Sequence, residues 1–171
     1  AKIFIDNWRW RGVPFHIRSG KRMEKKLSEV AIFFKRIPHS IFGPIRPEDM
    51  PQNVLVLNIQ PEEGFGITIS AKEPGPKLCM GSLSMDFKYS EIMEGEPPDA
   101  YERLLLDCML NDQTLFLSSD GIEVSWALLT PVLEEWARRG DKGLLKYPAG
   151  SWGPPEADRL IQKDGFSWRN Q

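Results

Sequence analysis

Five segments of the chain have the alternating or β-branched pattern of apolar residues that is typical of β-strands. The clearest one covers residues 53–59, where Val54 and Val56 alternate with two leucines and an isoleucine. Because both faces of this segment are apolar, we expect a central strand that is covered on both sides. The segments predicted as strands are residues 13–17, 29–35, 53–59, 66–71 and 79–89.

Three later segments change to the spacing of an α-helix, in which apolar residues recur every three or four positions. In the first of them, Leu104, Leu105 and Cys108 fall on one face. Acidic residues at its start complement the positive end of the helix dipole. The segments predicted as helices are residues 99–110, 118–140 and 156–163.

The second predicted helix is the longest. Ser118 can cap its first turn, and Gly140 is suited to end it. We expect Pro131 to kink this helix, because proline has no amide hydrogen for the helical ladder. Its apolar stripe consists of Ile122, Trp126, Leu129, Leu133 and Trp136.

Successive strands followed by clustered helices predict an α+β fold with a mainly antiparallel sheet. A chain of 171 residues, two-fifths of them hydrophobic, is long enough to form one domain with its own core. No repeat or convincing linker divides it, so we expect a single domain over residues 1–171.

Charge and hydropathy exclude several classes of partner. A formal net charge of -2 gives no large field that would draw the chain to nucleic acid or to an anionic membrane. No apolar run approaches the roughly 18 residues that suggest a membrane span. We therefore expect a cytoplasmic protein without nucleic-acid or membrane partners. Cys79 and Cys108 lack disulfide density and metal-ligand spacing, so we expect buried, reduced thiols and no metal site.

Four unusual strings lie in order along the chain, and together they carry a resemblance. They are RWRGVPFHIRSGKRM, NIQPEEG, DAYERLLLDCMLNDQTLF and YPAGSWGPPEADRLI. This set resembles the C-terminal domain of glucose-6-phosphate dehydrogenase. The resemblance implies a large antiparallel sheet with helices packed on one face, and a sheet that contributes to subunit association. A homodimer or a homotetramer through the sheet is therefore expected.

The resemblance also assigns a substrate role to residues that are ambiguous by themselves. Lys21 follows an expected strand and a Ser-Gly turn, where a lysine is usually a solvated surface charge. In the resembled family, the lysine of the RSGK string and a basic residue five positions later approach bound glucose 6-phosphate. These positions are Lys21 and Lys26 here. Gln60 could be a strand-end cap, but the QPEEG string places it near the substrate by the same resemblance.

The catalytic parts that the resemblance implies do not occur in these residues. Family members oxidise glucose 6-phosphate with NADP in the oxidative pentose phosphate pathway, and a histidine in an HYLGKE-like string acts as general base. Here His16 lies inside an expected strand and His39 in a loop, so both are interpreted as structural or solvated. Gly64-Phe65-Gly66 lacks a third glycine and a following helix, and we interpret it as a turn. We expect no catalytic and no cofactor-binding residue in this chain, which should be inactive alone.

A second, structural NADP is bound by the C-terminal domain of some family members through basic residues. At three of the corresponding positions this chain has neutral side chains, namely Leu27, Ala31 and Asn58. We therefore predict no structural NADP here. Micromolar binding of NADP to this chain would contradict that prediction.

Two functional hypotheses remain open. The first is an excised domain of an NADP-dependent dehydrogenase, which supplies substrate contacts and a subunit interface to a site completed by an N-terminal half. The second is a naturally separate scaffold or regulatory protein that uses the same sheet to bind a partner. The start at Ala1 without methionine fits the first, although processing could do the same. Lys21, Lys26 and Gln60 also fit the first, since a pure scaffold does not need them.

Overall fold

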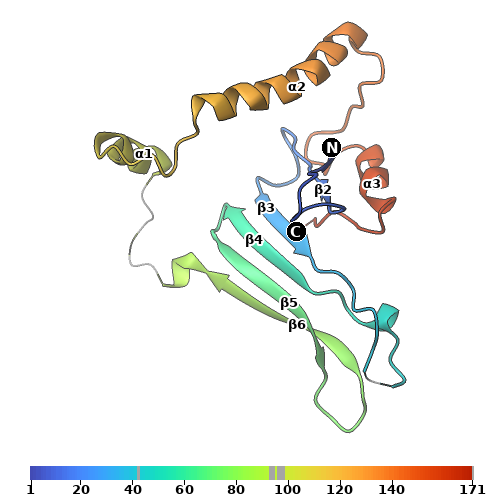
Figure 1. Ribbon diagram of the computed structural model, residues 1–171. Helices are drawn as coiled ribbons and strands as arrows, with labels where there is room; N and C mark the ends of the chain where they lie inside the picture. The colour runs from blue at the N-terminus through green and yellow to red at the C-terminus, as the bar shows by residue number, and fades with distance from the viewer. Residues whose placement is uncertain (42, 93–94, 96–98, 171) are drawn as a thin grey trace. The chain divides into compact units, whose positions relative to one another are not determined.

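The computed structural model describes residues 1–41, 43–92, 95 and 99–170, which form two compact units (Figure 1). The first unit combines Ala1–Lys25 with Asp99–Gln171, and the second consists of Lys26–Pro98. The expectation of a single domain stays a prediction. Within the described residues, no helix combines the length and the apolar character needed to cross a membrane.

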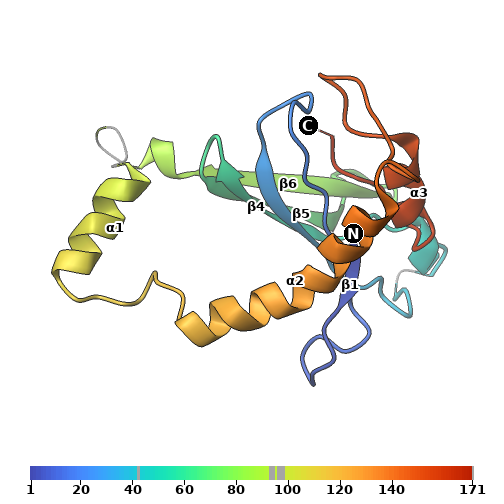
Figure 2. The ribbon, with the colours of Figure 1, turned by 90° about the horizontal axis from the view of Figure 1, so that it is seen from above.

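The second unit is built around an antiparallel four-stranded sheet. Its strands are β3 (Ser28–Phe33), β4 (Val54–Gln60), β5 (Gly64–Lys72) and β6 (Met80–Lys88). They pair in sequence order and run side by side in both views (Figures 1 and 2). The strand predicted to be central, β4, does lie inside the sheet, and its Val56 is 6% exposed. The expected cover on both faces is wrong, because Leu57 and Ile59 are 39% and 51% exposed. Short 3-10 helices at Pro47–Asp49 and Tyr89–Glu91 flank the strands.

Cross-strand register gathers the large apolar residues of this sheet on one face. Val30 lies opposite Leu57, Leu57 opposite Phe65, and Phe65 opposite Phe87. The Phe65 and Phe87 rings stack with their centroids 5.1 Å apart. Such directly opposed pairs stabilise a sheet, because their side chains touch across the strands. The period of two in the sequence thus becomes an apolar row that crosses all four strands.

The interpretation of Gly64-Phe65-Gly66 as a turn is wrong. These residues open β5 and pair with residues 86–88 of β6. Both glycines are buried, and a Cβ atom at Gly64 would press against the Phe87 carbonyl oxygen. Glycine in a strand often marks such a close approach of two backbones, and that requirement produces the pattern we had assigned to a turn.

The first unit contains a short hairpin and three helices. Strands β1 (Lys2–Phe4) and β2 (Pro14–His16) pair antiparallel, and the helices are α1 (Ala100–Met109), α2 (Ser119–Arg139) and α3 (Pro155–Gln162). Asp99 caps α1 by accepting a hydrogen bond from the Tyr101 amide at 2.8 Å, and Ser118 caps α2. Gly140 ends α2 with a positive φ of 59°, a backbone conformation that suits glycine.

The predicted strands and helices agree with the observed ones to within about two residues at each end, which is the usual scatter of element boundaries. Strand β1 was not among the predicted strands. Helix α2 continues through Pro131, and a kink there stays a prediction.

The expected burial of the cysteines is wrong. Cys79 and Cys108 are both free, as expected, but both are exposed. Cys79 lies just before β6, which is an edge strand of its sheet, and Cys108 lies in the last turn of α1. The lack of disulfide and metal-ligand spacing favoured burial, but these two positions lie at the ends of elements.

Candidate functional site

Lys21 lies in a turn that follows β2, and contacts from the C-terminal segment fix the backbone of that turn. The Tyr147 hydroxyl donates a hydrogen bond to the Lys21 carbonyl oxygen at 2.8 Å. The Gly150 amide donates to the Arg22 carbonyl oxygen, also at 2.8 Å. Met23 and Ser151 then form an isolated parallel bridge. These three contacts join segments that are more than 120 residues apart in the sequence.

The Lys21 side chain itself is exposed, and it makes no ion pair within the described part of the chain. Its ammonium therefore keeps its hydrogen-bond donors for a ligand, while the turn below it is held in place. This is the arrangement that a binding lysine needs, because a fixed backbone lowers the entropy lost when the side chain orders.

Arg18 anchors the start of the same turn. Its guanidinium carbon lies 5.0 Å from the Trp152 ring centroid and 4.8 Å from that of Trp168, within the range of cation-π attraction. The same group donates to the Asn170 side-chain oxygen at 2.8 Å. Arg18 therefore works as a structural anchor between β2 and the C-terminal segment, and the two tryptophans beside it are half-buried.

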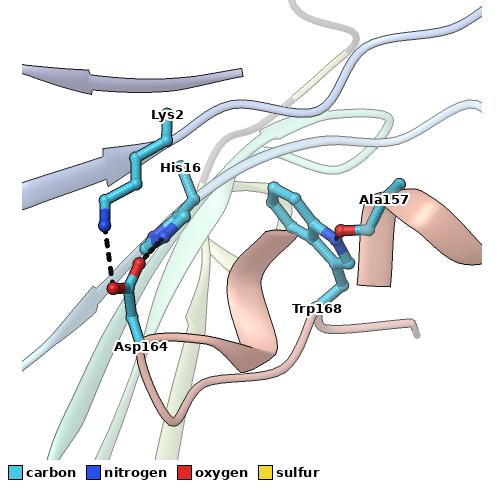
Figure 3. A network of polar contacts seen from close by, with 5 residues as sticks. All are labelled: Lys2, His16, Ala157, Asp164 and Trp168. Carbon is cyan, nitrogen blue, oxygen red and sulfur yellow. Dashed lines mark hydrogen bonds and ion pairs between the residues drawn. The ribbon is translucent and has the colours of Figure 1, made fainter. Parts of the chain in front are cut away.

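A polar network connects β2 to the loop that follows α3 (Figure 3). Asp164 accepts a hydrogen bond from the Lys2 ammonium at 2.8 Å and contacts His16 Nε2 at 2.7 Å. The His16 side chain is 9% exposed, so it is held within this network, and its interpretation as a structural residue stays a prediction. Beside it, the Trp168 indole donates to the Ala157 carbonyl oxygen at 2.9 Å. The Asp164 contacts hold the C-terminal segment against the β1–β2 hairpin, and the Trp168 bond ties the end of that segment to α3.

This network predicts a loss of stability at low pH. Hydrogen bonds from Lys2 first, and from His16 second, lower the pKa of Asp164 below the usual value for aspartate. A carboxylate with a lowered pKa contributes stability above its unfolded pKa of about 4, and that contribution is lost as the pH falls through the folded pKa. We expect Asp164→Asn to destabilise the first unit at about pH 5, and the difference from the unsubstituted chain to shrink by about pH 3.

Urea unfolding followed by tryptophan fluorescence measures this difference, because all six tryptophans belong to the first unit. Asp6→Asn is the matched control, since the Asp6 side chain is 88% exposed and lies 3.8 Å from Arg11. Exposed pairs of this kind contribute little. An Asp164→Asn chain that is as stable as the unsubstituted chain at both pH values would contradict the structural role of the network.

Lys26 and Gln60 lie together in the second unit. Gln60 pairs with Ser28 across β3 and β4, and Lys26 precedes Ser28 by two residues. Both side chains are exposed at this end of the sheet. Nearby, Lys88 and Glu62 form an ion pair at 2.8 Å, and Glu62 raises the pKa of Lys88. The structure thus places Lys26 and Gln60 at one sheet end, and a site shared with Lys21 stays a prediction because Lys21 belongs to the first unit.

The DAYERLLLD string forms helix α1 and has an architectural role there. Asp107 is 2% exposed, and the Arg103 guanidinium lies 2.9 Å from its carboxylate one turn earlier in the helix. A buried carboxylate requires such a partner, since an unpaired one would be costly. In the described ranges, acidic, histidine and cysteine side chains form no cluster that could hold a metal ion.

Comparisons with known proteins identify the family. Residues 1–169 match the family described as "Glucose-6-phosphate dehydrogenase, C-terminal domain". The chain belongs to this family. Its fold class is thereby confirmed as α+β with an antiparallel sheet, whereas the packing of the helices on one face of the sheet stays a prediction.

Several glucose-6-phosphate 1-dehydrogenases are similar to this family member along its whole length. The enzyme of Chlamydia pneumoniae is 44% identical over 170 residues, which are 98% of this chain and 33% of the relative. That of Treponema pallidum is also 44% identical, over 99% of this chain and 33% of the relative. The chain thus spans about a third of the length of these relatives.

A solved structure supports the same assignment. It is described as glucose-6-phosphate dehydrogenase in complex with its substrate glucose-6-phosphate. This structure is 32% identical, with a TM-score of 0.84, over 99% of this chain and 34% of its own. A second structure, from Mycobacterium avium, has a TM-score of 0.74 at 33% identity, over 99% of this chain and 34% of its own.

Sequence reasoning found the exposed polar residues but not the groups that fix their backbone. Tyr147 and Gly150 belong to the YPAGSW string, which marked the family and received no role. The only sequence signal for them was their place in that string. Their contacts with Lys21 and Arg22 depend on folding that brings residues 21–23 and 147–151 together.

Proposed function

We propose that this chain is the C-terminal part of an NADP-dependent glucose-6-phosphate 1-dehydrogenase. The complete enzyme oxidises glucose 6-phosphate to the 6-phosphogluconolactone in the oxidative pentose phosphate pathway of the cytoplasm. The observation that carries this proposal is the family match over residues 1–169. The share of a third of the relatives' length supports a role as one part of a longer enzyme.

Within that enzyme, the chain contributes contacts to the sugar phosphate. The Lys21 ammonium is suited to a charge-assisted hydrogen bond with an anionic, hydroxyl-rich ligand. Lys26 adds a second positive charge, and the Gln60 amide can donate to one hydroxyl and accept from another. Their exposure supports this role. Each of these groups binds and orients the substrate, and none of them removes the proton.

The general base and the NADP site belong to the part of the enzyme outside this chain. NADP supplies hydride acceptance when it is bound. The two histidines described here support this division, since His16 is held by Asp164 and His39 lies in a loop. The isolated chain is therefore inactive, and the neutral residues Leu27, Ala31 and Asn58 give it no structural NADP site.

The sheet also contributes to a homodimer or homotetramer interface. The apolar row of the second unit includes Val30, Leu57 and Phe65, which are 39–46% exposed. A contiguous apolar face of this kind is typical of a surface that another protein covers. Its place on the sheet agrees with the sheet-mediated association that the resemblance implies.

The intact mass of the native protein tests this proposal. An antibody raised against this chain would detect it in lysates of the source cells, and mass spectrometry would size the captured protein. We expect a species roughly three times as long as this chain, by the share that it spans of its relatives. A native species of 19.6 kDa would contradict the proposal and favour a separate scaffold or regulatory protein.

A further inference from the structure

The Tyr147 hydroxyl contacts the backbone of the residue to which we assign substrate binding. It donates to the Lys21 carbonyl oxygen at 2.8 Å, and the two residues are 126 positions apart in the sequence. The Tyr147 ring is half-buried, whereas Lys21 is exposed. The Tyr147 hydroxyl thus bonds to the backbone of the turn that carries Lys21.

The contact leaves little free space around the turn. A Cβ atom at Gly20 would lie 2.7 Å from the Tyr147 hydroxyl oxygen and 3.0 Å from the Met23 sulfur. The hydroxyl thus fits against a backbone position that only glycine leaves open. Arg22, the next residue after Lys21, has a positive φ of 54°, which is uncommon outside glycine and is maintained by surrounding contacts.

The three contacts with the turn differ in what a substitution can test. The Gly150 bond and the Met23–Ser151 bridge are formed by the backbone, so no side chain can be changed to remove them. The Tyr147 bond is formed by one hydroxyl group, which phenylalanine lacks. It is also the contact that acts directly on Lys21.

We propose that Tyr147 is a positioning residue for substrate binding, and that its hydroxyl holds the Lys21 backbone so that the ammonium is presented to the phosphorylated sugar. The inference rests on the proposed function of Lys21. Tyr147 does not touch the substrate in this scheme. Tyr147 affects the reaction only through Lys21, so Tyr147→Phe should not raise the KM for glucose 6-phosphate by more than Lys21→Ala does.

The experiment is a double-mutant cycle in the complete dehydrogenase, with Tyr147→Phe and Lys21→Ala alone and together. Losing one neutral hydrogen bond corresponds to roughly a three- to tenfold rise in the KM for glucose 6-phosphate. We expect this rise with kcat nearly unchanged, because the hydroxyl is remote from the reacting atoms. In the Lys21→Ala background, Tyr147→Phe should have no further effect on KM.

Tyr89→Phe is the matched control, since it removes the same group from a tyrosine of the second unit whose ring packs on Phe87. It should leave KM unchanged. Melting temperatures of all variants distinguish a positioning effect from loss of fold. A Tyr147→Phe effect of equal size in both backgrounds would show that Tyr147 acts independently of Lys21, and would overturn the inference.

Two further outcomes separate this inference from the proposed function. If Lys21→Ala raises KM and Tyr147→Phe does not, Lys21 binds substrate without the help of Tyr147, and only the inference fails. If Lys21→Ala leaves KM unchanged, the substrate role of Lys21 fails, and the inference fails with it.

A second variant, Gly20→Ala, disturbs the same contact by changing the turn instead of the tyrosine. Gly20→Ala should push the Tyr147 hydroxyl away and raise KM by a similar factor. In the Tyr147→Phe background the obstructing oxygen is gone, so adding Gly20→Ala should raise KM less than it does in the unsubstituted enzyme. An undiminished Gly20→Ala effect in that background would contradict the role of the hydroxyl.

Discussion

Lys21→Ala in the complete dehydrogenase is expected to raise the KM for glucose 6-phosphate by roughly 10- to 150-fold. This range corresponds to the 1.5–3 kcal/mol of a hydrogen bond to a charged group. The Lys21 side chain is exposed on a turn whose backbone is held by Tyr147, and its neighbour Arg22 is held by Gly150. Alanine removes the ammonium and leaves both backbone contacts in place. Steady-state kinetics with varied glucose 6-phosphate measures the change.

Lys25→Ala is the matched control for this prediction. It removes the same charge from the same segment, four residues further along, from a side chain that is also exposed. If attraction by the general positive charge of the segment were the cause, both variants would raise KM similarly. We expect less than about a twofold change for Lys25→Ala, since screening weakens contributions from exposed charges that make no contact. Equal effects of the two variants would reject a specific contact by Lys21.

Gly64→Ala is expected to destabilise the sheet of the second unit by about 3 kcal/mol, at the upper end of the cost of overpacking. The new methyl group would press against the Phe87 carbonyl oxygen and the Lys88 Cα atom, which belong to the backbone of β6. Neither can rotate away, so β5 and β6 would have to separate locally. Replacing glycine in a strand favours folding by only about 0.5–1 kcal/mol through lost chain entropy, and the clash therefore dominates.

Gly66→Ala is the matched control, two residues further along the same strand and on the same face. Its methyl group would lie 2.5 Å from the Asp86 Oδ1 atom, whereas the Asp86 Cγ atom is 3.7 Å away. A carboxylate can rotate, so the expected cost is about 1 kcal/mol or less. The difference between the two variants therefore tests whether the obstacle is backbone or side chain.

Amide hydrogen exchange over residues 54–88 measures both variants. The second unit contains no tryptophan, so fluorescence reports only on the first unit and serves as an internal reference. A loss of 3 kcal/mol accelerates exchange through global opening by roughly a hundredfold. Exchange that is as slow in Gly64→Ala as in Gly66→Ala would show that β6 yields easily at Phe87.

Local patterns were sufficient to predict most of the fold. Strands β3, β4 and β6 followed from β-branched or alternating apolar residues, and α1 and α2 followed from helical spacing, with a cap predicted at Ser118. These signals are local because hydrogen bonding and burial repeat along the element itself. Strand β1 was not predicted, and Gly64-Phe65-Gly66 was mistaken for a turn, because glycine occurs both in tight turns and in closely approaching strands.

The candidate site was also predictable only in part from the sequence. Lys21, Lys26 and Gln60 could be named only through the family strings that contain them, because each is ambiguous by itself. By itself the sequence determined the family, the α+β class and these three candidates. Only the tertiary structure showed that Tyr147 holds Lys21, that Asp164 joins Lys2 and His16, and that β6 closes against Gly64. Each of these contacts pairs residues 20 or more positions apart, and the closure of the chain between them is a property of the whole fold and leaves no periodic trace in the sequence.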